Sequence, residues 1–277
     1  MKRIFDSGLR LMLTLALSVV FVGSIMAQNK TKVVAHRGHW DTEGSYENTI
    51  TALKMAHEVG ADACEFDVNM TTDGVLVVCH GPKVGDIPNV QNATYAEVMA
   101  VTLPNGEKVP TLEQFLKAGK KGYKVKQKDG STKLMKLPLV LEIKTPTTFE
   151  QGTEVVTKVA YMLKKMKMLD QVSIISFSYH VCVEAAKQLP GTMVQYLTGD
   201  KTPYELKDAG IMGMDYHHSL TLLNPEWIEQ AHDLGMVVNV WTVDKADVIS
   251  TMIQLGVDYI TTNKPALAKE LIEKAGK

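Results

Sequence analysis

From Gln28 onward the chain alternates short apolar runs with segments of helical periodicity, and this alternation restricts the possible folds more than any other feature. Short apolar runs between turn signals are typical of buried strands, and a 3.6-residue apolar repeat is typical of amphipathic helices. The predicted strands are 32–35, 61–68, 137–143, 172–176, 193–197, 211–216, 237–242 and 259–262. The predicted helices are 48–59, 149–168, 179–188, 204–209, 225–234, 245–255 and 265–274.

This alternation predicts a (β/α)8 barrel of the TIM type, in which a closed parallel sheet of about 250 residues is ringed by helices. The later strands are nearly continuous apolar runs, as expected for strands that are covered on both faces. Glycines end several helices just before the next strand, at Gly60, Gly235 and Gly256 for example. An open doubly wound sheet is the alternative, but no glycine-rich phosphate loop follows the first strand.

One stretch, from His80 to Leu137, interrupts the alternation because it is too long for an ordinary strand–helix connection. A short extended run at 74–79 precedes it, and short helices are predicted within it at 95–101 and 112–118. The sequence therefore predicts an inserted subdomain at residues 81–136, after the second strand and over the mouth of the barrel.

The basic segment 123–136 contains Asp129-Gly130, a dipeptide that is typical of a β-hairpin turn. Its lysines predict a solvated hairpin. A lid, a dimer contact and a membrane-surface patch are alternatives, and the oligomeric state is left open.

The first 27 residues are organised like a secretory signal peptide. Three basic residues precede an apolar run at 11–22, and small or apolar residues then lead to Ala27. The run is shorter than the roughly 20 residues that a membrane span requires. We therefore predict cleavage after Ala27, a mature single domain at 28–277 with no stable membrane span, and a secreted, periplasmic location. An uncleaved N-terminal anchor is the alternative.

Charge and cysteine content narrow the class of protein further. Without residues 1–27, Lys+Arg falls from 30 to 27 and Asp+Glu from 31 to 30, so the net charge is −3. No basic stripe remains, which argues against nucleic acid as a partner. Cys64, Cys79 and Cys182 lie in apolar contexts and do not form a disulfide framework. We interpret them as buried small hydrophobic residues, with a Cys64–Cys79 disulfide as the alternative.

Three acidic residues are predicted to meet inside the barrel. Glu65 and Asp67 are two residues apart on one strand, so both side chains leave the same face, and Glu142 lies near the end of the next parallel strand. Clustered carboxylates repel one another unless a cation compensates them. An all-oxygen ligand set suits one divalent cation, Ca²⁺ or Mg²⁺, better than zinc. A salt-bridge network with Arg37 and Lys144 is the alternative.

Two histidines end apolar runs at the same predicted rim. His36 ends the first strand, and His80 ends the extended run after the second. An ordinary histidine pKa of about 6.5 suits proton transfer near neutral pH, so we interpret them as an acid–base pair. Arg37 and Lys144 are nearby cations that can hold a phosphate. A metal site, two histidines and two cations together favour phosphodiester cleavage over sugar or peptide hydrolysis.

Seven motifs occur in an order that resembles the glycerophosphodiester phosphodiesterase family, within the phospholipase C-like phosphodiesterase superfamily. The resemblance covers almost all of the chain after residue 27. It implies a (β/α)8 barrel with an inserted subdomain after the second strand, and divalent-metal-dependent hydrolysis of glycerophosphodiesters to glycerol 3-phosphate and an alcohol. The motifs are His36-Arg37-Gly38, Glu47-Asn48-Thr49, Glu65-Phe66-Asp67, Thr72-Asp73-Gly74, Pro110-Thr111-Leu112-Glu113, Leu141-Glu142-Ile143-Lys144 and Val240-Trp241-Thr242-Val243.

The resemblance also implies roles for individual residues. His36 and His80 match the acid–base histidines of the family. Arg37 and Lys144 match positions that contact the substrate phosphate.

The remaining matches concern the metal and the floor of the site. Glu65, Asp67 and Glu142 match the metal ligands. Glu47 matches an acid that orients the neighbouring arginine or completes the metal shell. Trp241 matches a tryptophan expected to pack under the substrate, with core filling as the alternative.

Three positions depart from the family pattern. Tyr46 stands where the family usually has proline, Gly81 where it usually has aspartate, and Asn263 where aspartate is common. The change at Gly81 matters most because it removes an acid that would orient His80.

Two alternative functions remain open from the sequence. A phosphodiesterase of the same fold could act on an inositol, sphingolipid or sugar-phosphate diester, with the insertion selecting the headgroup. A binding protein with a decayed site is the non-enzymatic alternative, suggested by Gly81. His217 and His218 follow the sixth strand and could also face the mouth.

Overall fold

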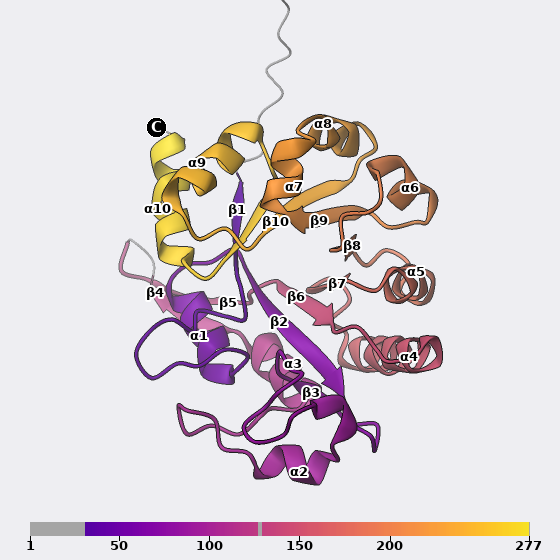
Figure 1. The fold of residues 1–277 in the computed structure, drawn as a ribbon. Helices are drawn as coiled ribbons and strands as arrows, with labels where there is room; N and C mark the ends of the chain where they lie inside the picture. Colours follow the sequence, from indigo (N-terminus) through magenta and orange to yellow (C-terminus); the bar gives the residue numbers. More distant parts are fainter. Residues whose placement is uncertain (1–30, 127–128, 277) are drawn as a thin grey trace, which may run out of the picture.

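The computed structural model describes residues 31–126 and 129–276 (Figure 1). The predicted signal peptide, residues 1–27, lies outside the described residues. Among the helices that are described, none combines the length and the apolar character needed to cross a bilayer.

Eight parallel strands close into a barrel, as predicted. Each strand pairs with its neighbours in the order β1-β11-β10-β9-β8-β7-β6-β2, and the pairing Val34↔Ala63 between β1 and β2 completes the circle. This closure excludes the open doubly wound sheet. The strands are β1 (Lys32–Ala35), β2 (Ala63–Met70), β6 (Leu139–Ile143), β7 (Val172–Ser176), β8 (Val194–Tyr196), β9 (Gly213–His217), β10 (Val237–Trp241) and β11 (Tyr259–Thr262).

Helices surround the barrel (Figure 1). Several begin at a threonine or serine whose side chain accepts a backbone N–H, such as Thr49 before α1 and Ser178 before α5. The short α7 (His218–Leu223) directly follows β9 and was not predicted. The other barrel helices are α1 (Ile50–Glu58), α4 (Phe149–Met166), α5 (Tyr179–Gln188), α6 (Pro203–Asp208), α8 (Glu226–Asp233), α9 (Ala246–Leu255) and α10 (Pro265–Ala275).

Alternation along each strand separates the core from the site. On β6, Leu139, Leu141 and Ile143 are buried in the main apolar core together with residues of the surrounding helices. Full burial of such a side chain contributes about 1.5–3 kcal/mol. The residue between the last two, Glu142, must point the other way, into the barrel. The same strands that build the core therefore carry polar side chains to the interior.

The insertion after β2 has its own small core. The strand β3 (Leu76–Val78) pairs antiparallel with the end of β2, and η1 (Val90–Asn92) and α2 (Tyr95–Ala100) follow. Its buried side chains form a cluster separate from the main core: Val77, Cys79, Val84, Val90, Ala93, Val98 and Val109.

Assigning helix 112–118 to the insertion was wrong. The helix α3 (Leu112–Lys121) packs Phe115 against Phe66 of β2, with ring centroids 4.3 Å apart, and its buried residues belong to the main core. It is therefore the barrel helix that follows β2. The error arose because the long preceding segment hid the strand–helix alternation.

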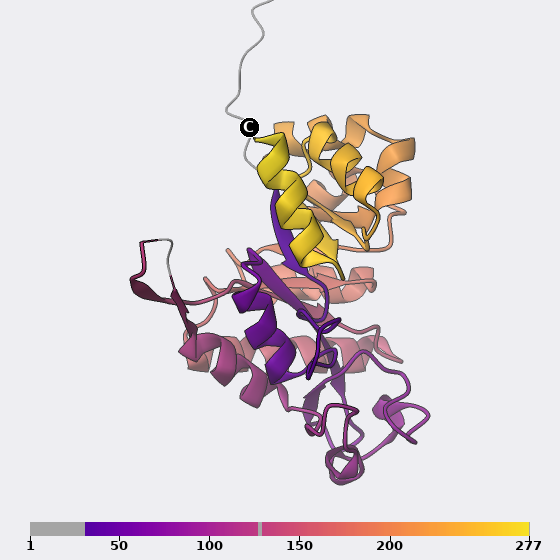
Figure 2. The same ribbon diagram turned by 90° about the vertical axis from the view of Figure 1, so that its left-hand side faces the viewer.

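The predicted hairpin exists, with β4 (Tyr123–Lys126) paired to β5 (Thr132–Met135), but its predicted place over the mouth was wrong. It ends just before β6 begins, so it lies at the amino-terminal end of the strands, opposite the mouth. Figure 2 shows it projecting away from the insertion that carries α2. His57 of α1 supports its base through a 2.9 Å contact from Nε2 to the Met135 carbonyl oxygen.

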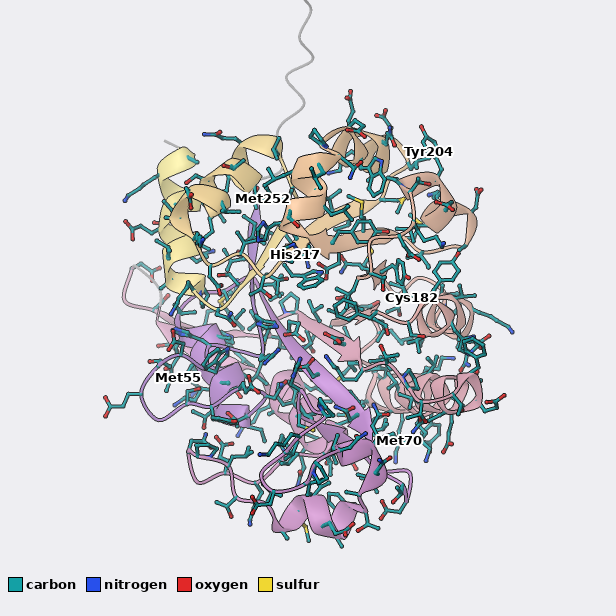
Figure 3. The ribbon with its side chains drawn as sticks, in the orientation of Figure 1. Met55, Met70, Cys182, Tyr204, His217 and Met252 are labelled. Carbon is teal, nitrogen blue, oxygen red and sulfur yellow. The ribbon has the colours of Figure 1, made fainter. Side chains whose placement is uncertain are left out.

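All three cysteines are buried and free, which excludes the alternative of a Cys64–Cys79 disulfide. Cys182 lies on α5 at the edge of the barrel (Figure 3).

Candidate active site

The three predicted acids meet inside the barrel. Glu65 and Asp67 lie on β2, level with the carboxyl ends of β1 and β6, and Glu142 is the last residue but one of β6. Asp67 and Glu142 are register partners on these strands, and Glu65 lies two residues before Asp67. One carboxylate oxygen from each residue lies within 4.8 Å of the others, and all three residues are buried. The predicted convergence of these residues is therefore present in the structure.

Burial and mutual repulsion make this cluster electrostatically costly without a cation. Burial and then Asp67 raise the pKa of Glu65 well above its usual value, and the same causes raise the pKa of Glu142 to about 7. Glu65 Oε1 accepts no hydrogen bond from the described residues. A hard divalent cation prefers such oxygen ligands, so the residues present fit Ca²⁺ or Mg²⁺.

Two cations border the cluster. Arg37 donates from its backbone N to Glu65 Oε2 at 2.7 Å and from Nη1 to Glu47 Oε2 at 2.6 Å, and its Nε lies 3.5 Å from Asp67. Lys144 Nζ lies 2.8 Å from Glu142 Oε1 and 3.3 Å from Asp67 Oδ1. The salt-bridge network considered as an alternative is thus present at the border of the acid cluster.

Asn48 is a site residue that the sequence analysis quoted within a motif but did not assign. Its side-chain amide donates to Asp67 Oδ2 at 2.8 Å, and its side-chain oxygen accepts the Asp67 backbone N–H at 2.9 Å. Burial alone would raise the pKa of Asp67, but Lys144, Arg37 and this amide together hold it below its usual value. Consecutive motif residues therefore do separate work: Glu47 binds Arg37, Asn48 holds Asp67, and Thr49 caps α1.

His36 lies directly beside the acids. Its Nε2 is 4.0 Å from Glu65 Oε2, and its Nδ1 is 2.8 Å from Asn263 Oδ1. Burial, followed by the nearby Arg37, lowers the pKa of His36 below its ordinary value. The imidazole is therefore biased toward the neutral form, which can accept a proton.

His80 approaches the same mouth from the insertion. Burial is the main cause that lowers its pKa, with the negative charge of Asp67 opposing this effect and the positive charge of Lys144 adding to it. The backbone before it is held by Asn69, whose side chain donates to the Cys79 carbonyl oxygen at 2.8 Å and accepts from Gln91 at 2.9 Å. The insertion therefore supplies one of the two histidines.

The glycine at position 81 has a local structural reason. Its φ is +62°, a left-handed conformation that side-chain-bearing residues rarely adopt. A Cβ there would also approach Asn69 Nδ2 at 3.2 Å and Val90 Cγ1 at 3.3 Å. The tight turn after His80 therefore favours glycine at the position where an acid is missing.

Aromatic rings line the β7–β10 side of the mouth. Trp241 donates from Nε1 to the Asp215 carbonyl oxygen at 2.9 Å, and its ring lies 5.2 Å from both Phe177 and His217. His217 stands exposed at the end of β9 (Figure 3), with its ring 4.3 Å from that of His218. Phe177 was missed because a single phenylalanine after a strand gives no functional signal.

Comparisons with known proteins agree with this architecture. Residues 36–267 match the model of the glycerophosphoryl diester phosphodiesterase family. A glycerophosphodiester phosphodiesterase from Caldanaerobacter subterraneus is 31% identical over 261 residues, covering 89% of this chain and 100% of that protein. The crystal structure of a glycerophosphodiester phosphodiesterase from Parabacteroides distasonis is 39% identical, with a TM-score of 0.84, covering 90% of this chain and 100% of that one.

A more distant similarity supports the fold alone. An Oleispira antarctica phosphodiesterase, solved in complex with the product sn-glycerol-3-phosphate, is 20% identical with a TM-score of 0.71, covering 87% of this chain and 96% of that one. Taken with the family match over most of the barrel, the chain belongs to the glycerophosphoryl diester phosphodiesterase family and is a phosphodiesterase.

Proposed function

We propose that the protein hydrolyses glycerophosphodiesters to glycerol 3-phosphate and an alcohol, using one divalent cation and two histidines. The observation that carries this proposal is the buried triad Glu65, Asp67 and Glu142 with the Nε2 atom of His36 4.0 Å from Glu65. The match of residues 36–267 to the family model and the similarity to a glycerophosphodiester phosphodiesterase that is 31% identical support a glycerophosphodiester substrate.

The three acids would hold Ca²⁺ or Mg²⁺ in this proposal. When bound, the cation supplies positive charge that polarises the phosphate and stabilises charge developing on its oxygens. Arg37 and Lys144 border the same cluster and bind the phosphate, Arg37 through its fork of donors and Lys144 as a point charge. Glu47 holds the Arg37 guanidinium in place.

The histidines move the protons. His36 Nε2 accepts the proton of the attacking hydroxyl, from water or from the substrate glycerol, as a new P–O bond forms. His80, in its protonated form, which the negative charge of Asp67 favours, donates a proton to the leaving alkoxide as the old P–O bond breaks, so an alcohol departs. Where the substrate hydroxyl attacks, this step leaves a cyclic phosphate, and water then opens the ring to glycerol 3-phosphate, with His80 accepting the proton of that water and His36 returning its proton to the released glycerol oxygen. Trp241 packs its ring under the organic part of the substrate, beside Phe177.

The proposed location follows from the sequence pattern of residues 1–27. We propose that this segment is removed as a signal peptide and that residues 28–277 act as a single domain in the periplasm. Mature protein isolated from the periplasm should begin at Gln28, and a mature protein that retains residues 1–27 would contradict this.

The catalytic proposal is tested by His36→Ala and His80→Ala, assayed on a panel of diesters with added Ca²⁺ or Mg²⁺. Each variant should lose about 10²–10⁴-fold in kcat, the usual contribution of general acid–base catalysis, while thermal unfolding remains cooperative. Near wild-type turnover by either variant would remove that histidine from the mechanism.

The same panel tests the substrate class. Glycerophosphodiesters should be turned over with release of glycerol 3-phosphate. Faster turnover of inositol, sphingolipid or sugar-phosphate diesters would replace the proposed substrate. Binding without turnover in either metal would indicate a decayed site.

A further inference from the structure

A hydrogen-bonded chain of side chains stands behind His36, on the side away from the acids. Asn263 follows β11, and Asp244 follows β10. Asn263 Oδ1 lies 2.8 Å from His36 Nδ1 and accepts the Trp40 Nε1–H at 3.1 Å. Asn263 Nδ2 donates to Asp244 Oδ2 at 2.8 Å.

These partners determine which way the amide of Asn263 points. The indole of Trp40 can only donate, so the amide atom it contacts must be the oxygen. The carboxylate of Asp244 can only accept, so the atom it contacts must be the nitrogen. Both constraints agree, and the oxygen therefore faces His36.

An oxygen acceptor at Asn263 requires a hydrogen on His36 Nδ1. In the neutral imidazole, the other nitrogen then carries a lone pair, and that nitrogen is the one 4.0 Å from Glu65 Oε2. The lone pair thus points toward the acid cluster.

We propose that Asp244 and Asn263 are a positioning pair that sets the tautomer of His36 and aims its unprotonated Nε2 into the site. This rests on the proposed function, in which His36 is the base. Neither residue acts on the substrate directly.

The pair also restricts which residue can stand at position 263. Asp244 Oδ1 accepts the Asn263 backbone N–H at 2.8 Å and the Thr262 hydroxyl at 3.0 Å, so its carboxylate is held in place. A carboxylate at position 263 would meet it at hydrogen-bond distance without a proton between them. Like charges at that separation repel, so the two positions must change together.

Exchanging the residues at positions 244 and 263 tests whether the two must change together. The variants are Asn263→Asp, Asp244→Asn and the double exchange Asp244→Asn/Asn263→Asp. In the double variant, an amide at 244 can still accept the Thr262 hydroxyl and the backbone N–H, and can donate to a carboxylate at 263. That carboxylate still accepts from His36 and Trp40, so every hydrogen bond is conserved.

Each single variant should lose about 10²-fold in kcat, because His36 would no longer direct an unprotonated Nε2 into the site. KM should change little, because the phosphate-binding residues are untouched. The double variant should recover most of that loss. A double variant no more active than the worse single variant would overturn the pairing. If a single variant unfolds, the double variant still tests the pairing, because its hydrogen bonds are conserved.

A spectroscopic readout separates this proposal from the catalytic role of His36. The ¹⁵N chemical shifts of the His36 ring, measured in chelator at a pH where the ring is neutral and assigned by comparison with His36→Ala, should show hydrogen on Nδ1. Asn263→Ala should shift the population toward hydrogen on Nε2. An Nε2–H ring in the wild type, or no change in Asn263→Ala, would overturn the proposal. Full activity in Asn263→Ala together with the expected shift toward hydrogen on Nε2 would instead contradict the role of His36 as base.

Discussion

At the scale of single residues, Glu65 is the clearest place where function opposes stability. It is 2% exposed, and one of its oxygens has no hydrogen-bond partner among the described residues. Its pKa is raised well above the ordinary value by burial, then by Asp67 and Glu142. The folded protein therefore holds a proton on this carboxyl more tightly than the unfolded chain does. Without a metal, the contribution of Glu65 to stability falls as the pH rises above the unfolded pKa of about 4.3.

Glu65→Gln should remove this cost. In chelator at pH 7, the free energy of unfolding should rise by about 1–2 kcal/mol relative to wild type, and the difference should vanish at about pH 3, well below the unfolded pKa of about 4.3, where the carboxyl of the wild type is protonated in both states. Urea unfolding at the two pH values measures this. A variant less stable than wild type at pH 7 would show that the negative charge of Glu65 stabilises the metal-free protein.

A buried carboxylate can be added at Asn48, whereas Glu65→Gln removes one. Asn48 has a left-handed φ of 61°, and its side-chain amide donates a hydrogen bond to Asp67. Asn48→Asp keeps the shape of the side chain, and aspartate tolerates this backbone conformation. It replaces a donor with a carboxylate oxygen beside a buried carboxylate. Stability in chelator at pH 7 should fall by about 2 kcal/mol or more, as expected when a buried charged group loses its partner. Urea unfolding indistinguishable from wild type would contradict the role of Asn48.

At the scale of elements, the structure separates two segments that the sequence analysis grouped as one insertion. The segment with β3 and α2 leads to the mouth and carries His80. The hairpin β4–β5 lies at the other end of the barrel (Figure 2). A role for this hairpin as a lid is therefore excluded by position.

Shortening the hairpin tests this separation. Residues Lys124 and Leu134 are register partners, so residues 125–133 can be replaced by Asn-Gly, which favours a tight two-residue turn. The kcat/KM for a glycerophosphodiester should remain within about twofold of wild type, because no proposed site residue is touched. A large rise in KM would instead implicate the hairpin in binding substrate.

At the scale of the whole molecule, the barrel was predictable because its strands and helices repeat one simple pattern. Predicted boundaries of the barrel strands and of the barrel helices other than α3 and α7 agree with the structure within two residues, the usual uncertainty of element ends. The exceptions, α3 and α7, lie beside long or unusual connections. There, the distinction between a barrel helix and an insertion depends on tertiary packing, such as the Phe66–Phe115 contact.

The meeting of the acids could be predicted because the alternation of side chains along a strand determines which residues point into the barrel. Glu65, Asp67 and Glu142 converge because alternate side chains of neighbouring parallel strands point to the same face, here the interior of the barrel. Asn263 was noticed only as a departure, and Asp244 was not noticed at all. Their contacts join the ends of β10 and β11 to β1, and no local spacing in the sequence encodes such a contact.

The central claim is that the three converging acids hold a cation on which turnover depends. The most direct measurement is the turnover of glycerophosphocholine by metal-stripped protein as Ca²⁺ or Mg²⁺ is titrated, with ion binding followed by calorimetry and Glu142→Gln as the matched variant. We predict no turnover without the ion, recovery that saturates at one ion per chain, and loss of both binding and turnover in Glu142→Gln. Undiminished turnover after exhaustive chelation would contradict the account.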